Sequence, residues 1–238
     1  MQSFAQISTQ LPWEEIDTVL LDMDGTLLDR HYDDYFWEVH LPEHYSLLHD
    51  LPVNAAAEEL LARYRTTENS LQWADIDHWS RELKLDIPEL KLRIGDLIAV
   101  HPHVPEFLAF CREQGKQLFL VTNAHPRTLA IKLERTKISG WFDRLICAEE
   151  VGFAKEEPQF WGRLQEMLGF DPARSLLADD TEKVLRTAEH CGIGFLLHIA
   201  KPNSRRQPSR SVRYASVETF AEFMAATGQR RREGKKHT

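Results

Sequence analysis

The sequence has few cysteines and no long hydrophobic run. Its three cysteines lie far apart in apolar segments and form no Cys-x-x-Cys pair, at Cys111, Cys147 and Cys191. This pattern is typical of reduced core thiols rather than of disulfides or a thiol metal site. No apolar run approaches the ~18 residues that span a bilayer, and the segment Met1 to Pro12 lacks the pattern of a signal peptide. We therefore expect a cytoplasmic protein with no membrane partner.

Basic residues are in the minority. The formal net charge is −8, because 37 acidic residues outnumber 29 lysines and arginines. Since binding to a phosphate backbone depends on clustered lysine and arginine, this charge disfavours a general nucleic-acid binder. The exception is the segment 229–238, a basic tail that could contact RNA or an acidic partner. We expect this tail to be disordered and solvated.

Apolar periodicity divides the chain into a strand, a helical region and an alternating region. Residues 18–21 are typical of a buried strand, and the spacing from about Arg30 to Val100 predicts only helices, at 54–65, 71–83 and 88–99. From Val104 onward the pattern predicts helices alternating with strands at 117–122, 144–148, 175–178 and 194–199, then a last helix at 216–226. Such alternation indicates a parallel sheet with right-handed crossovers. The sequence therefore predicts an α/β core with a helical insertion after the first strand.

Two carboxylates follow the first predicted strand at a glycine. Asp22 and Asp24 come directly after the apolar run, and ligands of parallel α/β sheets bind beyond the carboxyl ends of the strands. Gly25 allows the loop to turn so that the two side chains can act separately. This arrangement suits a nucleophile beside a metal ion, although a surface turn with helix-capping acids would use the same residues.

Four segments, in this order, resemble the motifs of the haloacid dehalogenase (HAD) superfamily. They are residues 22–28, the strand that ends in Thr122 and Asn123, the loop residue Lys155, and the strand that ends in Asp179 and Asp180. The stretches 35–37, 122–126 and 179–182 are similar to bacterial GMP/IMP nucleotidases, which are purine 5′-nucleotidases of this superfamily. The resemblance spans most of the chain. It implies a Rossmann-like core of residues 1–29 and 103–238, with a helical cap of residues 30–102 that closes over the carboxyl edge of the sheet.

The resemblance implies a phosphatase for small phosphate monoesters, with GMP and IMP as the expected substrates. By the family mechanism, Asp22 attacks phosphorus to form an aspartyl phosphate, and Asp24 protonates the leaving oxygen and then activates water. Thr122 and Asn123 would bind phosphate together with backbone N–H groups. Lys155 would hold the nucleophile and the phosphate together by charge. Here Lys155 is followed by two glutamates before Pro158, whereas the common superfamily form is Lys-Pro.

A hard cation is expected at the acidic cluster. The resemblance implies Mg²⁺, held by the Asp22 side chain, the backbone carbonyl of Asp24 and Asp179, with Asp180 in the surrounding shell. The roles of Asp179 and Asp180 could be exchanged, because the sequence does not say which carboxylate faces the metal. Helix capping is the structural alternative for this pair.

The leaving group is less well defined by the sequence than the chemistry. One aromatic ring of the cap could stack on a purine, with Tyr35 and Trp37 as candidates, although most such rings would form the cap's own core. Pro42, between His40 and His44, predicts an interrupted helix there. The rival interpretations are a sugar-phosphate or phosphoglycolate phosphatase, and a non-catalytic or RNA-associated binding protein. The sequence does not define an oligomeric state.

Overall fold

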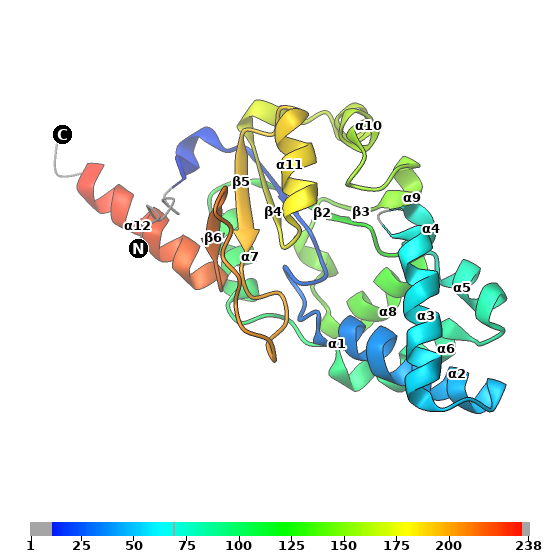
Figure 1. Ribbon diagram of the computed structural model, residues 1–238. Helices are drawn as coiled ribbons and strands as arrows, with labels where there is room; N and C mark the ends of the chain where they lie inside the picture. Colours follow the sequence, from blue (N-terminus) through cyan, green and yellow to red (C-terminus); the bar gives the residue numbers. More distant parts are fainter. Residues whose placement is uncertain (1–10, 69, 235–238) are drawn as a thin grey trace.

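The computed structural model describes residues 11–68 and 70–234, and side chains only as far as Thr227 (Figure 1). Its centre is a six-stranded sheet in the order β3-β2-β1-β4-β5-β6, and all neighbouring strands are parallel. The strands are β1 (Thr18–Leu21), β2 (Gln117–Thr122), β3 (Arg144–Cys147), β4 (Ser175–Asp179), β5 (Phe195–Ile199) and β6 (Ala215–Val217). The predicted α/β class with a Rossmann-like parallel sheet is confirmed.

Helices cover both faces of the sheet because the buried strands are apolar on both faces. Val19 and Leu21 of β1 pack into one hydrophobic cluster, with α7 (Val104–Glu113), α8 (Pro126–Thr136) and α12 (Phe220–Gly234). Leu20 points to the other cluster, with α9 (Ala148–Val151), α10 (Pro158–Leu168) and α11 (Glu182–His190). This alternation is the period-two geometry of a strand. The strand ends are therefore fixed from both sides.

A helical insert, residues 31–97, lies between β1 and α7. It contains α1 (His31–Tyr35), a π-helix (Phe36–His40), α2 (Leu41–His49), α3 (Val53–Thr67), α4 (Leu71–Ala74), α5 (Ile76–Leu83), α6 (Ile87–Arg93) and a 3₁₀ turn (Gly95–Leu97). The insert has its own hydrophobic cluster, built around Phe36, Leu60 and Trp79. In Figure 1 it lies at the lower right, beside the core.

Three predicted helices differ in their extent from those of the structure. The helix expected over 71–83 is broken at Asp75, whose side chain accepts hydrogen bonds from the N–H groups of Asp77 and His78 and so starts a new helix. The helix expected over 88–99 ends at Arg93 and continues only as a 3₁₀ turn. The predicted last helix at 216–226 was wrong at its start, because 215–217 form β6 and the helix begins at Phe220. A three-residue strand is too short for its periodicity to be recognised.

The helical backbone is continuous past Pro42, so the predicted interruption was wrong. Pro42 sits in the first turn of α2 and follows the π-helix, and both His40 and Leu41 keep right-handed helical angles. Proline is tolerated in a first turn, and a π-helix shifts the hydrogen-bond pattern just before it.

The last helix also reaches into the segment expected to be disordered. α12 continues to Gly234, whereas residues 235–238 lie outside the described part of the chain. Within the described residues, no helix combines the length and apolar character that crossing a bilayer requires. All three cysteines are free thiols, and two of them, Cys111 and Cys147, are buried.

Candidate active site

Three polar side chains lie at the carboxyl ends of neighbouring central strands. Asp22 directly follows β1, and its N–H donates to the carbonyl of Ala178 in β4 (N–O 3.1 Å). Thr122 ends β2 and Asp179 ends β4, on either side of β1. The parallel register therefore brings residues 57 to 157 positions apart in the sequence to one edge of the sheet.

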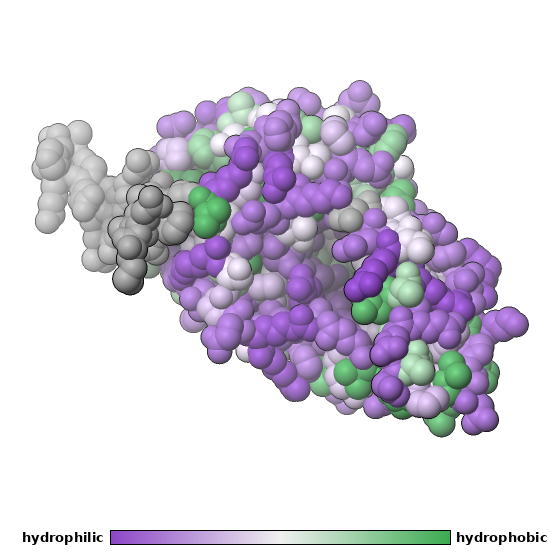
Figure 2. All heavy atoms as spheres, in the orientation of Figure 1, coloured by the Kyte–Doolittle hydropathy of each residue, from purple (hydrophilic) through white to green (hydrophobic). Residues whose placement is uncertain are grey.

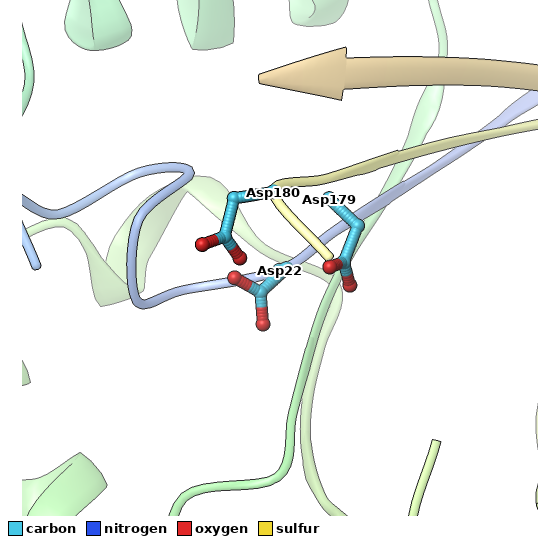
Figure 3. Close-up of side chains that lie close together, drawn as sticks. All are labelled: Asp22, Asp179 and Asp180. Atoms are coloured by element: carbon cyan, nitrogen blue, oxygen red, sulfur yellow. The ribbon is translucent and has the colours of Figure 1, made fainter. Parts of the chain in front are cut away.

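Asp22, Asp179 and Asp180 form a compact acidic cluster. One ligand atom from each carboxylate lies within 4.8 Å of the others, and Figure 3 shows the three side chains converging from the ends of β1 and β4. Lys155 joins two of them, because its Nζ lies 2.5 Å from Asp22 Oδ1 and 2.7 Å from Asp179 Oδ2. Arg30 Nη1 lies 2.6 Å from Asp180 Oδ2. Asp22 Oδ2 is buried and has no hydrogen-bond partner among the described residues.

The turn after β1 depends on glycine. Gly25 has φ +90°, and an ideal Cβ at this position would lie 2.6 Å from Asp180 Oδ2 and 2.9 Å from Pro202 Cβ. A side chain would therefore be strained and would also displace the Asp180 carboxylate. The close approach of this loop to β4 explains why Gly25 follows the two aspartates.

The Lys155 loop is tied to the end of β2 by Asn123. The Asn123 Oδ1 accepts from the Lys155 N–H (2.9 Å), and Asn123 Nδ2 donates to Glu156 Oε2 (2.8 Å). The two glutamates that separate Lys155 from Pro158 therefore have local partners, since Glu157 Oε1 accepts from the Ala154 N–H (2.8 Å). Although the Lys-Pro form is absent, the Lys155 ammonium lies between Asp22 and Asp179.

Burial changes the proton affinity of the acidic cluster. Burial raises the pKa values of Asp22, Asp24 and Asp179 to about 6. The pKa of Asp180 rises to about 7, because burial is joined by repulsion from Asp22. Burial opposes the charge on Lys155, but attraction by Asp179 and Asp22 outweighs it and raises the pKa of that ammonium. Three carboxylates share one buried ammonium and the partly exposed Arg30, so the cluster attracts a further cation.

A cavity of about 550 Å³ opens onto this cluster from the helical insert. Asp22, Thr122 and Lys155 line its core end, and Trp37 and Trp73 line its insert end. The surface is hollowed between the core and the insert, and hydrophilic residues surround the hollow (Figure 2). Of the two aromatic candidates from the sequence, only Trp37 lines the cavity. Tyr35 instead stacks with His40 and lies tilted against His31.

Several charged residues near the site were not found by sequence reasoning. Lys132 of α8 contacts Asp24 and Asp33, and Lys91 of α6 contacts Asp33. Both lysines are only 1% exposed. The sequence does contain a pattern that points to both lysines, because each occupies a core-facing helical position. Lys132 comes three residues after Leu129, and Lys91 comes four residues after Ile87. A lysine on the apolar face of an amphipathic helix needs a buried acid, but the pattern does not say which one.

Comparisons with known proteins point to one family. Residues 16–192 match the family model for haloacid dehalogenase-like hydrolases. The chain is 34% identical to the GMP/IMP nucleotidase YrfG of Escherichia coli K12, over 88% of this chain and 95% of that protein. It is 26% identical to a phosphoglycolate phosphatase of Pseudomonas putida, over 74% of this chain and 66% of that protein. A crystal structure of a HAD phosphatase from Thermococcus onnurineus shares the fold, with a TM-score of 0.75, 24% identity, and coverage of 90% and 98% of the two chains.

The family match covers well over half of the chain, and the similarity to the nucleotidase extends over almost the whole of both proteins. These findings confirm the predicted superfamily and the predicted enzyme class, a phosphoric monoester hydrolase. The chain belongs to the haloacid dehalogenase-like hydrolase family.

Proposed function

We propose that this hydrolase is a Mg²⁺-dependent phosphatase that acts on purine nucleoside 5′-monophosphates, GMP and IMP, through an aspartyl phosphate on Asp22. The observation that carries the proposal is a single cavity with the acidic cluster and Lys155 at one end and Trp37 and Trp73 at the other. The similarity to a GMP/IMP nucleotidase supports the same substrate class. The cavity volume of about 550 Å³ is within the ~300–1,000 Å³ range of small-molecule sites.

The residues at the acidic end fit a magnesium ion. Mg²⁺ prefers oxygen ligands in octahedral geometry, and the unpartnered, buried Asp22 Oδ2 is such a ligand beside two further carboxylates. The ion would be held by the Asp22 side chain, the Asp24 backbone carbonyl and a carboxylate of the Asp179–Asp180 pair. When bound, it supplies positive charge that offsets the repulsion between a phosphate dianion and these carboxylates.

The contacts favour Asp180 over Asp179 as the direct ligand. Both oxygens of Asp179 are engaged, Oδ2 by Lys155 Nζ and Oδ1 by the Thr181 N–H (2.8 Å). The Asp180 carboxylate faces Asp22 (Figure 3). Its Oδ1 accepts only from the Thr181 hydroxyl at 3.3 Å, and its Oδ2 pairs with Arg30, which is partly exposed and so can move aside for an ion. We therefore exchange the roles expected from the sequence, so that Asp179 orients Lys155 and Asp180 faces the metal.

The arrangement divides the reaction into two half-reactions. In the first, an Asp22 oxygen forms a bond to phosphorus while the bond from phosphorus to the ribose 5′ oxygen breaks, and Asp24 gives its proton to that oxygen. In the second, Asp24 takes a proton from water as the water attacks the aspartyl phosphate, which frees Asp22 and releases phosphate. Lys155 and the Thr122 hydroxyl stabilise the phosphoryl oxygens throughout. One positioned acid–base group contributes roughly 10²–10⁴ in rate, so these devices must act together.

The insert end of the cavity suits an aromatic base. The ring centroids of Trp37 and Trp73 lie 5.6 Å apart, and both residues also line an adjoining cavity of about 470 Å³ that includes Tyr64 and Leu61. Trp79 is buried, and Tyr64 reaches only the adjoining cavity; both belong to the insert's own core and neither lines the 550 Å³ cavity. Trp37 and Trp73, which are partly exposed, are therefore the rings available for stacking.

A panel of monophosphates tests the substrate class. We expect kcat/KM for IMP and GMP to exceed that for phosphoglycolate and glucose 6-phosphate by roughly 5- to 150-fold, because stacking of a base contributes ~1–3 kcal/mol. Steady-state release of phosphate in the presence of Mg²⁺ measures this. A preference for phosphoglycolate would replace the nucleotide proposal, and failure to hydrolyse every ester in the panel would overturn the phosphatase itself.

Replacing one ring separates base binding from chemistry. Trp37→Ala is expected to lower kcat/KM for IMP by roughly 5- to 150-fold, mainly through KM, and to leave ribose 5-phosphate nearly unaffected because that ester has no base to stack. The matched control is Tyr35→Ala, two residues earlier at the end of α1 but outside the cavity. An equal loss for both esters would show that Trp37 acts on the phosphate end or on folding.

A further inference from the structure

A chain of buried charges connects Asp24 with the helical insert. Lys132 Nζ lies 2.6 Å from Asp24 Oδ1 and 2.6 Å from Asp33 Oδ2, and Lys91 Nζ lies 3.1 Å from Asp33 Oδ1. Asp24 belongs to the loop after β1, Lys132 to α8, Asp33 to α1 and Lys91 to α6. The sequence Asp24–Lys132–Asp33–Lys91 alternates in sign, so the charges of the chain cancel.

The two lysines are placed where an unpaired charge would be strongly unfavourable. Each is 1% exposed, and burial of an ammonium is tolerated only with charged and hydrogen-bonded partners. Lys132 has no carboxylate partner other than Asp24 and Asp33 among the described residues. Replacing the chain with apolar side chains would satisfy burial as well, so stability alone does not explain why the charges are there.

The far end of the chain lies beneath the aromatic residues of the insert. Lys91 Nζ is 4.4 Å from the centroid of the Phe36 ring, 5.1 Å from that of Tyr32 and 5.4 Å from that of Trp37. These distances are within the range of cation–π attraction. Trp37 lines the cavity, so the same chain touches the ring proposed to bind the base and the carboxyl group proposed to move the proton.

The near end leaves one oxygen of Asp24 available. Lys132 engages Oδ1, whereas Oδ2 accepts no hydrogen bond from the described residues, and the Asp24 side chain is 23% exposed and lines the cavity. A carboxyl group that is held through one oxygen has its rotation restricted and presents the other oxygen in a defined direction. A proton donor needs this orientation, because proton transfer requires hydrogen-bond geometry with the leaving oxygen.

We propose that Lys132 and Asp33 are positioning residues that orient Asp24 for proton transfer and make that orientation depend on the docked insert. This inference rests on the proposed phosphatase function. Lys132 fixes Asp24 directly, and Asp33 fixes Lys132 from the insert. Lys91 holds the second oxygen of Asp33 and ties it to the aromatic residues near the base.

The test compares two leaving groups. The leaving group of IMP is inosine, an alcohol whose 5′ oxygen needs a proton. The leaving group of p-nitrophenyl phosphate is a stabilised phenolate that needs little protonation. Lys132→Met, which keeps the length of the side chain, is expected to lower kcat/KM for IMP by about 10²-fold, the lower range of a positioned acid, and to lower that for p-nitrophenyl phosphate less than tenfold. Asp33→Asn should act in the same direction. The double variant should lose no more than the worse single variant, because both substitutions break one chain.

The controls separate positioning from loss of structure. Glu134→Gln, on the exposed side of the same helix, should change neither substrate. Lys132→Arg keeps the charge with a different geometry and should also lower kcat/KM for IMP more than for the aryl ester. This variant preserves the test if Lys132→Met folds poorly. Equal losses for the two esters, or no loss for either, would overturn the proposed role. If the unmodified protein hydrolyses neither ester, the phosphatase proposal itself is overturned.

Discussion

Asp22→Asn is expected to abolish hydrolysis of IMP. The substitution keeps the shape of the side chain but removes the carboxylate that attacks phosphorus, and loss of a catalytic nucleophile costs about 10⁶ in kcat in a well-studied hydrolase. The neighbouring carboxylates have other roles in the proposal: Lys155 and Thr181 engage Asp179, Lys132 orients Asp24 toward the leaving oxygen, and Asp180 faces the metal. We expect a loss of at least about 10⁴-fold.

Two measurements distinguish a lost nucleophile from a damaged site. Rapid quenching followed by mass spectrometry should detect a phosphorylated enzyme in the unmodified protein and none in Asp22→Asn. Binding of IMP to the variant should persist, because Trp37, Thr122 and Lys155 remain. The control Asp50→Asn replaces an exposed acid at the end of α2, where asparagine also tolerates the left-handed backbone, and should retain full activity. Appreciable steady turnover by Asp22→Asn would contradict the covalent mechanism.

The sequence predicted the strand-end residues because the geometry of a parallel sheet is simple. Once β1, β2 and β4 are recognised as parallel neighbours, Asp22, Thr122 and Asp179 must lie at one edge. Lys155 is different, since it lies in a loop before α10 and no periodicity places it. Its position next to Asp22 was expected only from the order of the motifs, and in the structure it depends on the hydrogen bond from its N–H to Asn123.

The connections between core and insert could not be predicted from the sequence. Lys132 pairs with Asp24, 108 positions away, and with Asp33, 99 positions away. Several acids follow β1 within a few residues, and only the docking of the insert on α8 decides which of them meets the lysine. The short strand β6 was missed for a related reason, because its three residues gain their identity from pairing with β5 rather than from a pattern of their own.

Asp180→Asn and Asp179→Asn are expected to fail in different ways, although they are adjacent. Asp180 is the proposed direct ligand, so Asp180→Asn should raise the half-saturating Mg²⁺ concentration by more than about 100-fold, the upper range for supporting residues. Asp179→Asn should leave that concentration within about tenfold, the lower end of the same range, and should reduce kcat, because Lys155 loses one of its two partners. EDTA should abolish activity of the unmodified enzyme, and added Mg²⁺ should restore it.

The difference between Asp180→Asn and Asp179→Asn is more informative than either loss of activity alone. The two residues share one backbone turn and similar burial, so damage to folding would affect both variants alike. Titration of activity with Mg²⁺, with thermal unfolding of each variant as the check on structure, gives the apparent affinity and kcat separately. If Asp179→Asn shifts the Mg²⁺ requirement and Asp180→Asn does not, the roles first expected from the sequence are restored. In that event Lys155 would have to compete with the ion for Asp179, and its contact of 2.7 Å to Oδ2 would lengthen when the metal binds. Retention of full activity in EDTA by the unmodified protein would remove the cation from the mechanism and leave Lys155 and Arg30 as the charges that admit a phosphate to this acidic cluster.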